Sequence, residues 1–153
     1  MKVINENERE EIIIDKNILR YLYIEDIEES AKGTSFEYVN LETFKAQLAK
    51  EEEELKLEYK IWLSDKKKEM DRKIYTNETA KEDGVIAKYR EQYLQYNKKL
   101  IDLMYQRNLL QGISRATEMK ANLLIALLTN KKSKEENDKK VAEWNKKVEN
   151  TKI

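Results

Sequence analysis

The chain has 153 residues, of which 39% are charged, and it contains three glycines, no proline, no cysteine and no histidine. This length suits one domain with a modest core, and the scarcity of helix-breaking residues predicts an all-α fold. The absence of cysteine and histidine excludes disulfides, thiolate metal sites and the usual general base, and no glycine-rich phosphate loop occurs. We therefore expect a protein that is not an enzyme and uses no cofactor.

The net charge of zero conceals an uneven distribution of charge along the chain. Residues 1–65 hold 9 basic and 17 acidic side chains, whereas residues 66–153 hold 21 basic and 13 acidic ones. This asymmetry is compatible with charge pairing inside the chain, with head-to-tail association of copies, or with a basic half that binds nucleic acid.

Neither end of the sequence indicates a membrane protein. The first residues, MKVINENERE, lack the apolar region of a signal peptide, and the longest apolar run near the C-terminus is LLIALL at Leu123–Leu128. A helix needs roughly 20 apolar residues to span a bilayer. We therefore expect a cytoplasmic protein without a membrane partner.

The first predicted elements lie in residues 10–33. A β-branched run, Ile12–Ile14, favours a short strand or extended arm, and apolar residues at helical spacing follow it. Asp15 is a suitable cap and Gly33 a suitable stop signal for a short helix between them.

The second predicted element is a helix of about 35 residues that begins at Asn40 and ends near Thr76–Asn77. Its apolar residues recur every three or four positions, which is the spacing of one helix face. They are Leu41, Phe44, Leu48, Leu55, Tyr59 and Trp62. Trp62 is therefore predicted to lie in the core.

After a loop over Thr76–Gly84, whose Ala80–Asp83 portion could already be helical, the sequence predicts a second long helix of about 45 residues over Ile86–Leu128. Two long helices joined by a short loop predict an antiparallel hairpin. The second helix carries more apolar surface than one partner can cover, including Leu94 and Ile101. We therefore expect a homo-oligomeric helical bundle or ring.

Residues 131–153 are basic and offer only a thin apolar stripe of Val141, Trp144 and Val148. We expect a helical domain over residues 1–130 followed by a flexible or marginally helical tail that is dispensable for folding. A membrane-surface helix over Lys131–Lys147 is an alternative, although this stripe is thin for insertion.

A basic segment at Lys66–Tyr75 is the first candidate site. If it is helical, Lys68 and Arg72 are i,i+4 neighbours, and the other cations lie beside them. Cations along a backbone path bind phosphates, and an aromatic ring close by can stack on an unpaired base. The candidate DNA-binding residues here are Lys66, Lys67, Lys68, Arg72, Lys73 and Tyr75. The alternative is a solvated helix face.

A second polar line consists of Arg107, Gln111 and Arg115, which fall near one face of the second long helix. Arginine among apolar residues is costly unless it is paired or faces a cavity. Arg107 and Arg115 therefore either pair with the acidic run Glu51–Glu54 of another helix or line a DNA-binding surface. The acidic run itself is a poor metal site, because consecutive side chains fan around a helix.

Three parts of the chain together resemble the UvsY family of phage recombination mediators, which are small helical proteins. The parts are Ile14–Asp15, the run from Asn40 to Tyr75, and LIDLMYQRNLLQGISRATEMK at Leu100–Lys120. They span about two thirds of the chain, whereas the loop after Tyr75 and the basic tail after Asn130 differ from the family.

The resemblance implies a homo-oligomeric ring that binds single-stranded DNA, contacts a single-strand-binding protein and a recombinase, and helps to load the recombinase. It implies phosphate contacts by Arg72, Lys68 and Lys73, in the cytoplasm of a bacterial host. The alternative function is a helical protein–protein interaction module, either an assembly chaperone or an inhibitor of a host protein, with no role for nucleic acid.

Overall fold

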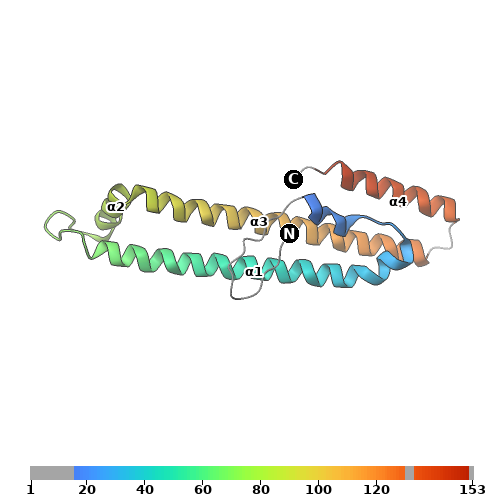
Figure 1. Cartoon of the computed structure of the whole chain (residues 1–153), viewed down its shortest axis with the longest axis horizontal. Helices are drawn as coiled ribbons and strands as arrows, with labels where there is room; N and C mark the ends of the chain where they lie inside the picture. The colour runs from blue at the N-terminus through green and yellow to red at the C-terminus, as the bar shows by residue number, and fades with distance from the viewer. Residues whose placement is uncertain (1–15, 130–132, 152–153) are drawn as a thin grey trace. The chain divides into compact units, whose positions relative to one another are not determined.

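A computed structural model describes residues 16–129 and 133–151, all in helices or short connections (Figure 1). In chain order the helices are the 3-10 helix η1 (Lys16–Leu22), α1 (Ile27–Lys67), α2 (Glu78–Lys88), α3 (Arg90–Thr129) and α4 (Lys134–Glu149). These residues contain no strand, so the predicted all-α fold is confirmed. The strand or arm predicted before Asp15 lies outside the described residues.

The chain divides into two compact units, and α1 and α3 contribute to both. Unit 1 combines the described residues up to Lys45 with those from Asn108 onward. In unit 1, Lys45 Nζ lies 2.8 Å from Gln111 Oε1, and Lys120 Nζ lies 2.9 Å from Glu37 Oε2. An increase in residue number on α1 therefore accompanies a decrease on α3, which means that the two helices are antiparallel in this unit.

Unit 2 comprises Ala46–Arg107 and shows the same antiparallel pairing. Trp62 Nε1 donates a hydrogen bond of 2.8 Å to Gln92 Oε1, and the Tyr59 and Tyr96 rings lie 5.7 Å apart. The predicted pairing of two long antiparallel helices is thus present within each unit.

The start of α1 differs from the prediction. Asp26 caps it: the Asp26 carbonyl oxygen accepts from Ser30 N, and Asp26 Oδ1 accepts from Glu29 N, both at 2.9 Å. Gly33 lies inside α1 with a negative φ. The predicted stop at Gly33 and start at Asn40 are therefore wrong, because glycine costs only about 1 kcal/mol in a helix interior that packing sustains.

The far end of α1 and the second long helix also differ in detail from the prediction. Helix α1 ends at Lys67, well before Thr76–Asn77. Asn77 Oδ1 accepts from Ala80 N at 2.7 Å and caps α2, so the alternative of a helical Ala80–Asp83 portion is confirmed. Tyr89, with φ −114° and ψ 41°, separates α2 from α3, a break that the apolar spacing does not reveal.

The C-terminal segment forms α4, which packs on η1 (Figure 1). Val148, only 3% exposed, clusters with Leu19 and Leu22 of η1, and Trp144 packs against the same cluster. The thin apolar stripe predicted for this segment is therefore the face with which it packs on η1.

Two helical glycines are positions at which alanine should stabilise the chain. A Cβ at Gly112 would meet nothing within 4 Å, and one at Gly33 would meet only Glu37 Oε1 at 4.0 Å. Alanine is favoured over glycine by about 1 kcal/mol in a helix interior. Gly112→Ala and Gly33→Ala should therefore each raise the free energy of unfolding by about 0.5–1 kcal/mol in urea titrations.

Gly84→Ala is the matched control for this prediction. Its Cβ would lie 2.6 Å from Tyr75 Cε1, so the gain in helix propensity should be offset by displacement of the Tyr75 ring. Equal stabilisation by all three substitutions would contradict the packing of Tyr75 on Gly84.

Candidate nucleic-acid interface

The predicted basic segment is the connection between α1 and α2, and most of it is not helical. Lys66 and Lys67 form the last turn of α1, and their carbonyl oxygens accept from Glu69 N and Met70 N at 3.1 and 3.2 Å. Such i→i+3 bonds tighten a helix end. Lys68–Tyr75 then runs through turns, so the prediction that Lys68 and Arg72 are helical neighbours is wrong.

Three lysines of this segment form ion pairs. Lys66 Nζ lies 3.4 Å from Glu69 Oε1 and 4.5 Å from the centre of the Tyr89 ring. The Tyr89 hydroxyl donates to Glu69 Oε2, and this bond, together with Lys66, lowers the pKa of the Glu69 carboxyl.

Lys67 and Lys68 also form ion pairs with carboxylates. Lys67 Nζ lies 3.5 Å from Glu78 Oε2 and 3.8 Å from Glu82 Oε2, and Lys68 Nζ lies 3.8 Å from Asp65 Oδ1. A hydrogen bond from Lys81, reinforced by Lys67, lowers the pKa of Glu78. Lys68 and Asp65 are both exposed, whereas Lys67 is half-buried. Ion pairs at the surface are weak, so a phosphate could compete most readily for Lys68.

Arg72 and Lys73 are the most available cations of the segment. Both are exposed, and neither side chain forms an ion pair with any residue that the structure describes. Asp71 Oδ1 accepts from Lys73 N at 2.8 Å and shapes the turn that presents them. Ile74 follows, with 70% of its side chain exposed, so one turn displays two cations beside an apolar group.

Tyr75 is partly covered, unlike the free stacking ring that the sequence suggested. Its ring packs on Gly84 of α2 so closely that a Cβ there would approach Tyr75 Cε1 to 2.6 Å. The side chain is half-buried. Tyr75 therefore helps to hold the connection against α2, and only part of the ring remains open to a base.

Arg107 pairs with the acidic run of α1, which was one of the two alternatives that the sequence left open. Arg107 Nη1 lies 2.8 Å from Glu52 Oε2, and Glu52 is only 3% exposed. Glu52 Oε1 lies 3.1 Å from Lys56 Nζ, so one buried carboxylate holds two cations. Hydrogen bonds to Glu52 and Glu53 raise the pKa of Lys56.

Arg115 belongs to unit 1, whereas the other candidate DNA-binding residues belong to unit 2. Arg115 is exposed and has no ion pair among the described residues. Gln111, the third member of the predicted polar line, accepts a hydrogen bond from Lys45. The structure thus brings together the candidates between Lys66 and Tyr75 but does not place Arg115 with them.

An aromatic cluster in unit 2 is a feature that the sequence prediction missed. Trp62 lies 5.7 Å from Tyr59, 5.5 Å from Tyr96 and 6.3 Å from Tyr89, measured between ring centres, and Tyr93 lies 6.2 Å from Tyr59. All five rings are half-buried, so Trp62 lies in this cluster rather than in a closed core. Burial, with Tyr93 nearby, raises the pKa of Tyr59.

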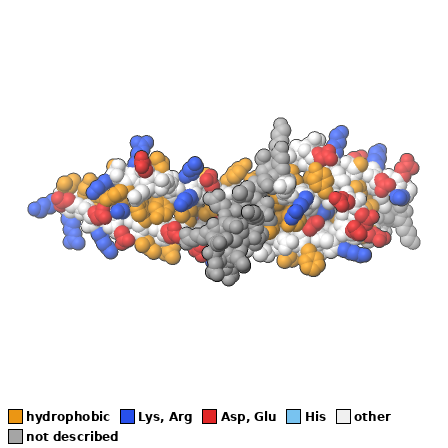
Figure 2. Space-filling model, in the orientation of Figure 1, with side chains coloured by type: hydrophobic (Ala, Val, Ile, Leu, Met, Phe, Trp, Pro, Cys, Tyr) orange, Lys and Arg blue, Asp and Glu red, His pale blue; other side chains and the backbone are white. Residues whose placement is uncertain are grey.

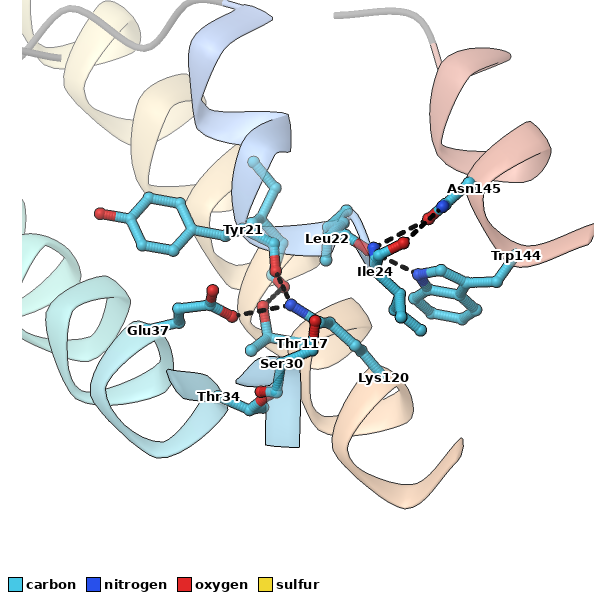
Figure 3. Close-up of polar contacts among 11 residues, drawn as sticks. Tyr21, Leu22, Ile24, Ser30, Thr34, Glu37, Thr117, Lys120, Trp144 and Asn145 are labelled. Carbon is cyan, nitrogen blue, oxygen red and sulfur yellow. Dashed lines mark hydrogen bonds and ion pairs between the residues drawn. The ribbon is translucent and has the colours of Figure 1, made fainter. Parts of the chain in front are cut away.

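A buried lysine in unit 1 is a second missed feature (Figure 3). Lys120 is 1% exposed, and its Nζ donates to the Tyr21 carbonyl oxygen and to Glu37 Oε2, both at 2.9 Å. Lys120 lies seven residues from both Ile113 and Leu127, which are buried too. That spacing places it on the buried face of α3 and could have identified it.

The described residues provide no group of three or more acidic side chains placed to hold a metal ion. None of the helices in residues 16–129 and 133–151 is both long and apolar enough to cross a membrane. No protein-family model, curated protein or solved structure matches the chain, so its function is inferred from its own residues.

Proposed function

We propose that the protein is a non-enzymatic accessory protein that binds single-stranded DNA through the connection between α1 and α2 and helps to load a recombinase. The observation that supports DNA binding is the exposed pair Arg72 and Lys73, which has no acidic partner among the described residues. The role in loading a recombinase follows from the resemblance to the UvsY family alone. The other expected partners are a single-strand-binding protein and further copies of the chain. The site of action is the cytoplasm.

The charge balance of this region sets the expected strength of binding. Residues 65–83 contain six basic and six acidic side chains, so the region attracts a polyanion only locally. Arg72 and Lys73 provide the first phosphate contacts, and Lys66, Lys67 and Lys68 can exchange carboxylates for phosphates. We therefore expect modest affinity with a clear dependence on salt.

The double substitution Arg72→Ala with Lys73→Ala tests this site. Each phosphate neutralised on a single strand contributes about 0.7 to the slope of log affinity against log salt, so the slope should fall by about 1.4. The measurement is a salt-dependent titration of fluorescent oligo-dT, with a duplex of equal length for comparison.

Lys67→Ala is the matched control, because Lys67 is held by Glu78 and Glu82. It should change the slope less than the double substitution does. An unchanged slope in the double variant would show that the connection is a solvated surface and would move attention to Arg115.

Exposed apolar residues on α3 support the homo-oligomer in this proposal. Leu94, Ile101 and Tyr105 are exposed, and their spacing of seven and four residues puts them near one helix face. Figure 2 shows hydrophobic side chains reaching the surface between charged ones on the face in view. Sedimentation in about 1 M salt, where the Debye length is about 3 Å, should show an oligomer held by apolar contacts.

A protein–protein interaction module is the second candidate function, and exposed residues of α1 favour it. Phe36 and Val39 are exposed in unit 1, and Leu57 and Ile61 are exposed in unit 2. An apolar helix surface of this kind suits a helical partner protein. Failure of the full chain to bind DNA at low salt would favour this function over the first.

A further inference from the structure

Unit 2 contains a small hollow on the side of the α1–α3 pair. It has a volume of about 100 Å³ and is partly open to solvent. Its lining residues are Leu55, Lys56 and Tyr59 of α1, and Tyr96, Asn97 and Leu100 of α3. None of the six was among the residues that the sequence suggested for DNA binding.

Two aromatic rings line the hollow, and neighbouring rings hold them in place. Tyr59 and Tyr96 meet edge to face, with an interplanar angle of 67°. Trp62 contacts both, and Tyr93 contacts Tyr59. Because these rings brace one another, the hollow is a preorganised aromatic surface, which reduces the entropy lost when a planar ligand binds.

Polar groups at the hollow suit a nucleotide. Asn97 Nδ2 donates to the Tyr93 carbonyl oxygen at 3.0 Å, which orients the amide, and Asn97 Oδ1 accepts no hydrogen bond from a described residue. Lys56 Nζ lies 3.1 Å from Glu52 Oε1 and 3.2 Å from Glu53 Oε1, so the ammonium group is held at this wall. The hollow thus combines two rings and an amide acceptor, whereas the charge of Lys56 is already balanced by two carboxylates.

We propose that this hollow accepts a base of single-stranded DNA, which contacts the rings of Tyr59 and Tyr96. The inference rests on the proposed function and adds a second contact region to the connection between α1 and α2. Proteins that bind single strands combine cations along the backbone with aromatic rings under the bases. Asn97 Oδ1 is placed to accept from an amino or imino hydrogen of the base.

Binding of the intact protein to oligo-dT and to an abasic oligonucleotide of equal length tests the inference. The abasic strand keeps the phosphates and lacks the bases, so oligo-dT should bind about 5- to 150-fold more tightly if one base is stacked. Tyr96→Leu should abolish this difference while leaving the abasic affinity and its salt slope unchanged. Tyr96→Phe, which keeps the ring, should retain the preference.

Tyr38→Leu is the control, because Tyr38 is an exposed tyrosine of α1 in unit 1 that does not line the hollow. It should keep the preference for oligo-dT.

Tryptophan fluorescence gives a second measurement, which does not depend on the stability of a Tyr96 variant. Trp62 contacts both rings of the hollow, so oligo-dT should change tryptophan emission in the wild type, and Trp62→Phe should remove most of that change.

The possible outcomes separate this inference from the proposed function. Equal affinity of the wild type for oligo-dT and the abasic strand would overturn the hollow as a base site, while DNA binding itself would stand. A preference for oligo-dT that survives Tyr96→Leu in a folded variant would also overturn it. Failure to bind either strand at low salt would overturn both proposals.

Discussion

Replacing Glu37 by alanine is expected to lower the free energy of unfolding by about 3 kcal/mol, which is more than replacing Lys120 by methionine should cost. Lys120 is 1% exposed, and Glu37 supplies the negative charge that compensates its ammonium group. Without Glu37 the buried cation retains only the Tyr21 carbonyl oxygen as a described partner (Figure 3). Urea titration followed by circular dichroism measures the loss.

Comparison with Lys120→Met tests whether the cost of losing Glu37 comes from the charge of Lys120. Lys120→Met keeps an unbranched side chain of similar length and removes the charge, while Glu37, 27% exposed, can be hydrated once it is unpaired. The expected cost is about 1–2 kcal/mol, mainly from the unpaired Tyr21 carbonyl group. The double variant should be no less stable than Glu37→Ala alone. If Glu37→Ala lowered the free energy of unfolding less than Lys120→Met does, the prediction would be wrong. The uncompensated charge on Lys120 would then not explain the effect of Glu37→Ala.

Removing α4 is expected to destabilise unit 1 strongly, and Trp144→Ala should reproduce most of the effect. Trp144 Nε1 donates to the Leu22 carbonyl oxygen at 2.6 Å, and its ring packs against the cluster of Leu19, Leu22 and Val148. Large-to-small changes at packed tryptophans cost about 3–5 kcal/mol, and the half-buried position of Trp144 favours the lower end. Thermal unfolding of the chain ended at Lys132 measures the effect.

This prediction reverses the expectation that the C-terminal segment is dispensable. From the sequence, three apolar side chains are expected to be too few to offset the conformational entropy lost when the segment forms a helix. The sequence could not reveal the polar contacts that also hold the segment in place. Asn145 accepts from Ile24 N at 2.9 Å and donates to the Ile24 carbonyl oxygen at 2.7 Å. Lys147→Ala, on the exposed face of α4, is the control and should be nearly neutral. An unchanged melting temperature after truncation would restore the original expectation.

The spacing of apolar residues over long stretches predicted the helical class, and the short loop between two long helices predicted their antiparallel pairing. Helix boundaries were less predictable. Asp26, which caps α1, was not among the predicted caps, which were Asp15 and Asn40, and Gly33 marks no boundary. The break at Tyr89 leaves no signal in the spacing of apolar residues, which continues through it.

The sequence predicted which basic residues belong to the candidate site, but not which of them are free of acidic partners and able to contact a phosphate. The cations between Lys66 and Lys73 were visible as a charge run. The partners of Lys67 come from α2 and depend on tertiary packing, whereas Lys66 and Lys68 pair with acids three residues away along the chain. The cover over Tyr75 arises from Gly84, because only a residue without Cβ allows that approach. Arg107 was a partial exception, because pairing with the dense acidic run Glu51–Glu54 was one of the two alternatives that the sequence left open.

The contacts of α4 also constrain the order in which the chain can fold during synthesis. The hydrogen bond from Trp144 to Leu22 spans 122 positions of the sequence, and those between Asn145 and Ile24 span 121. Unit 2 lies within one continuous stretch, Ala46–Arg107, and can pair as soon as that stretch has left the ribosome. Leu19 and Leu22 can pack against Val148 only after α4 has been synthesised, so a nascent chain displays this apolar surface until then.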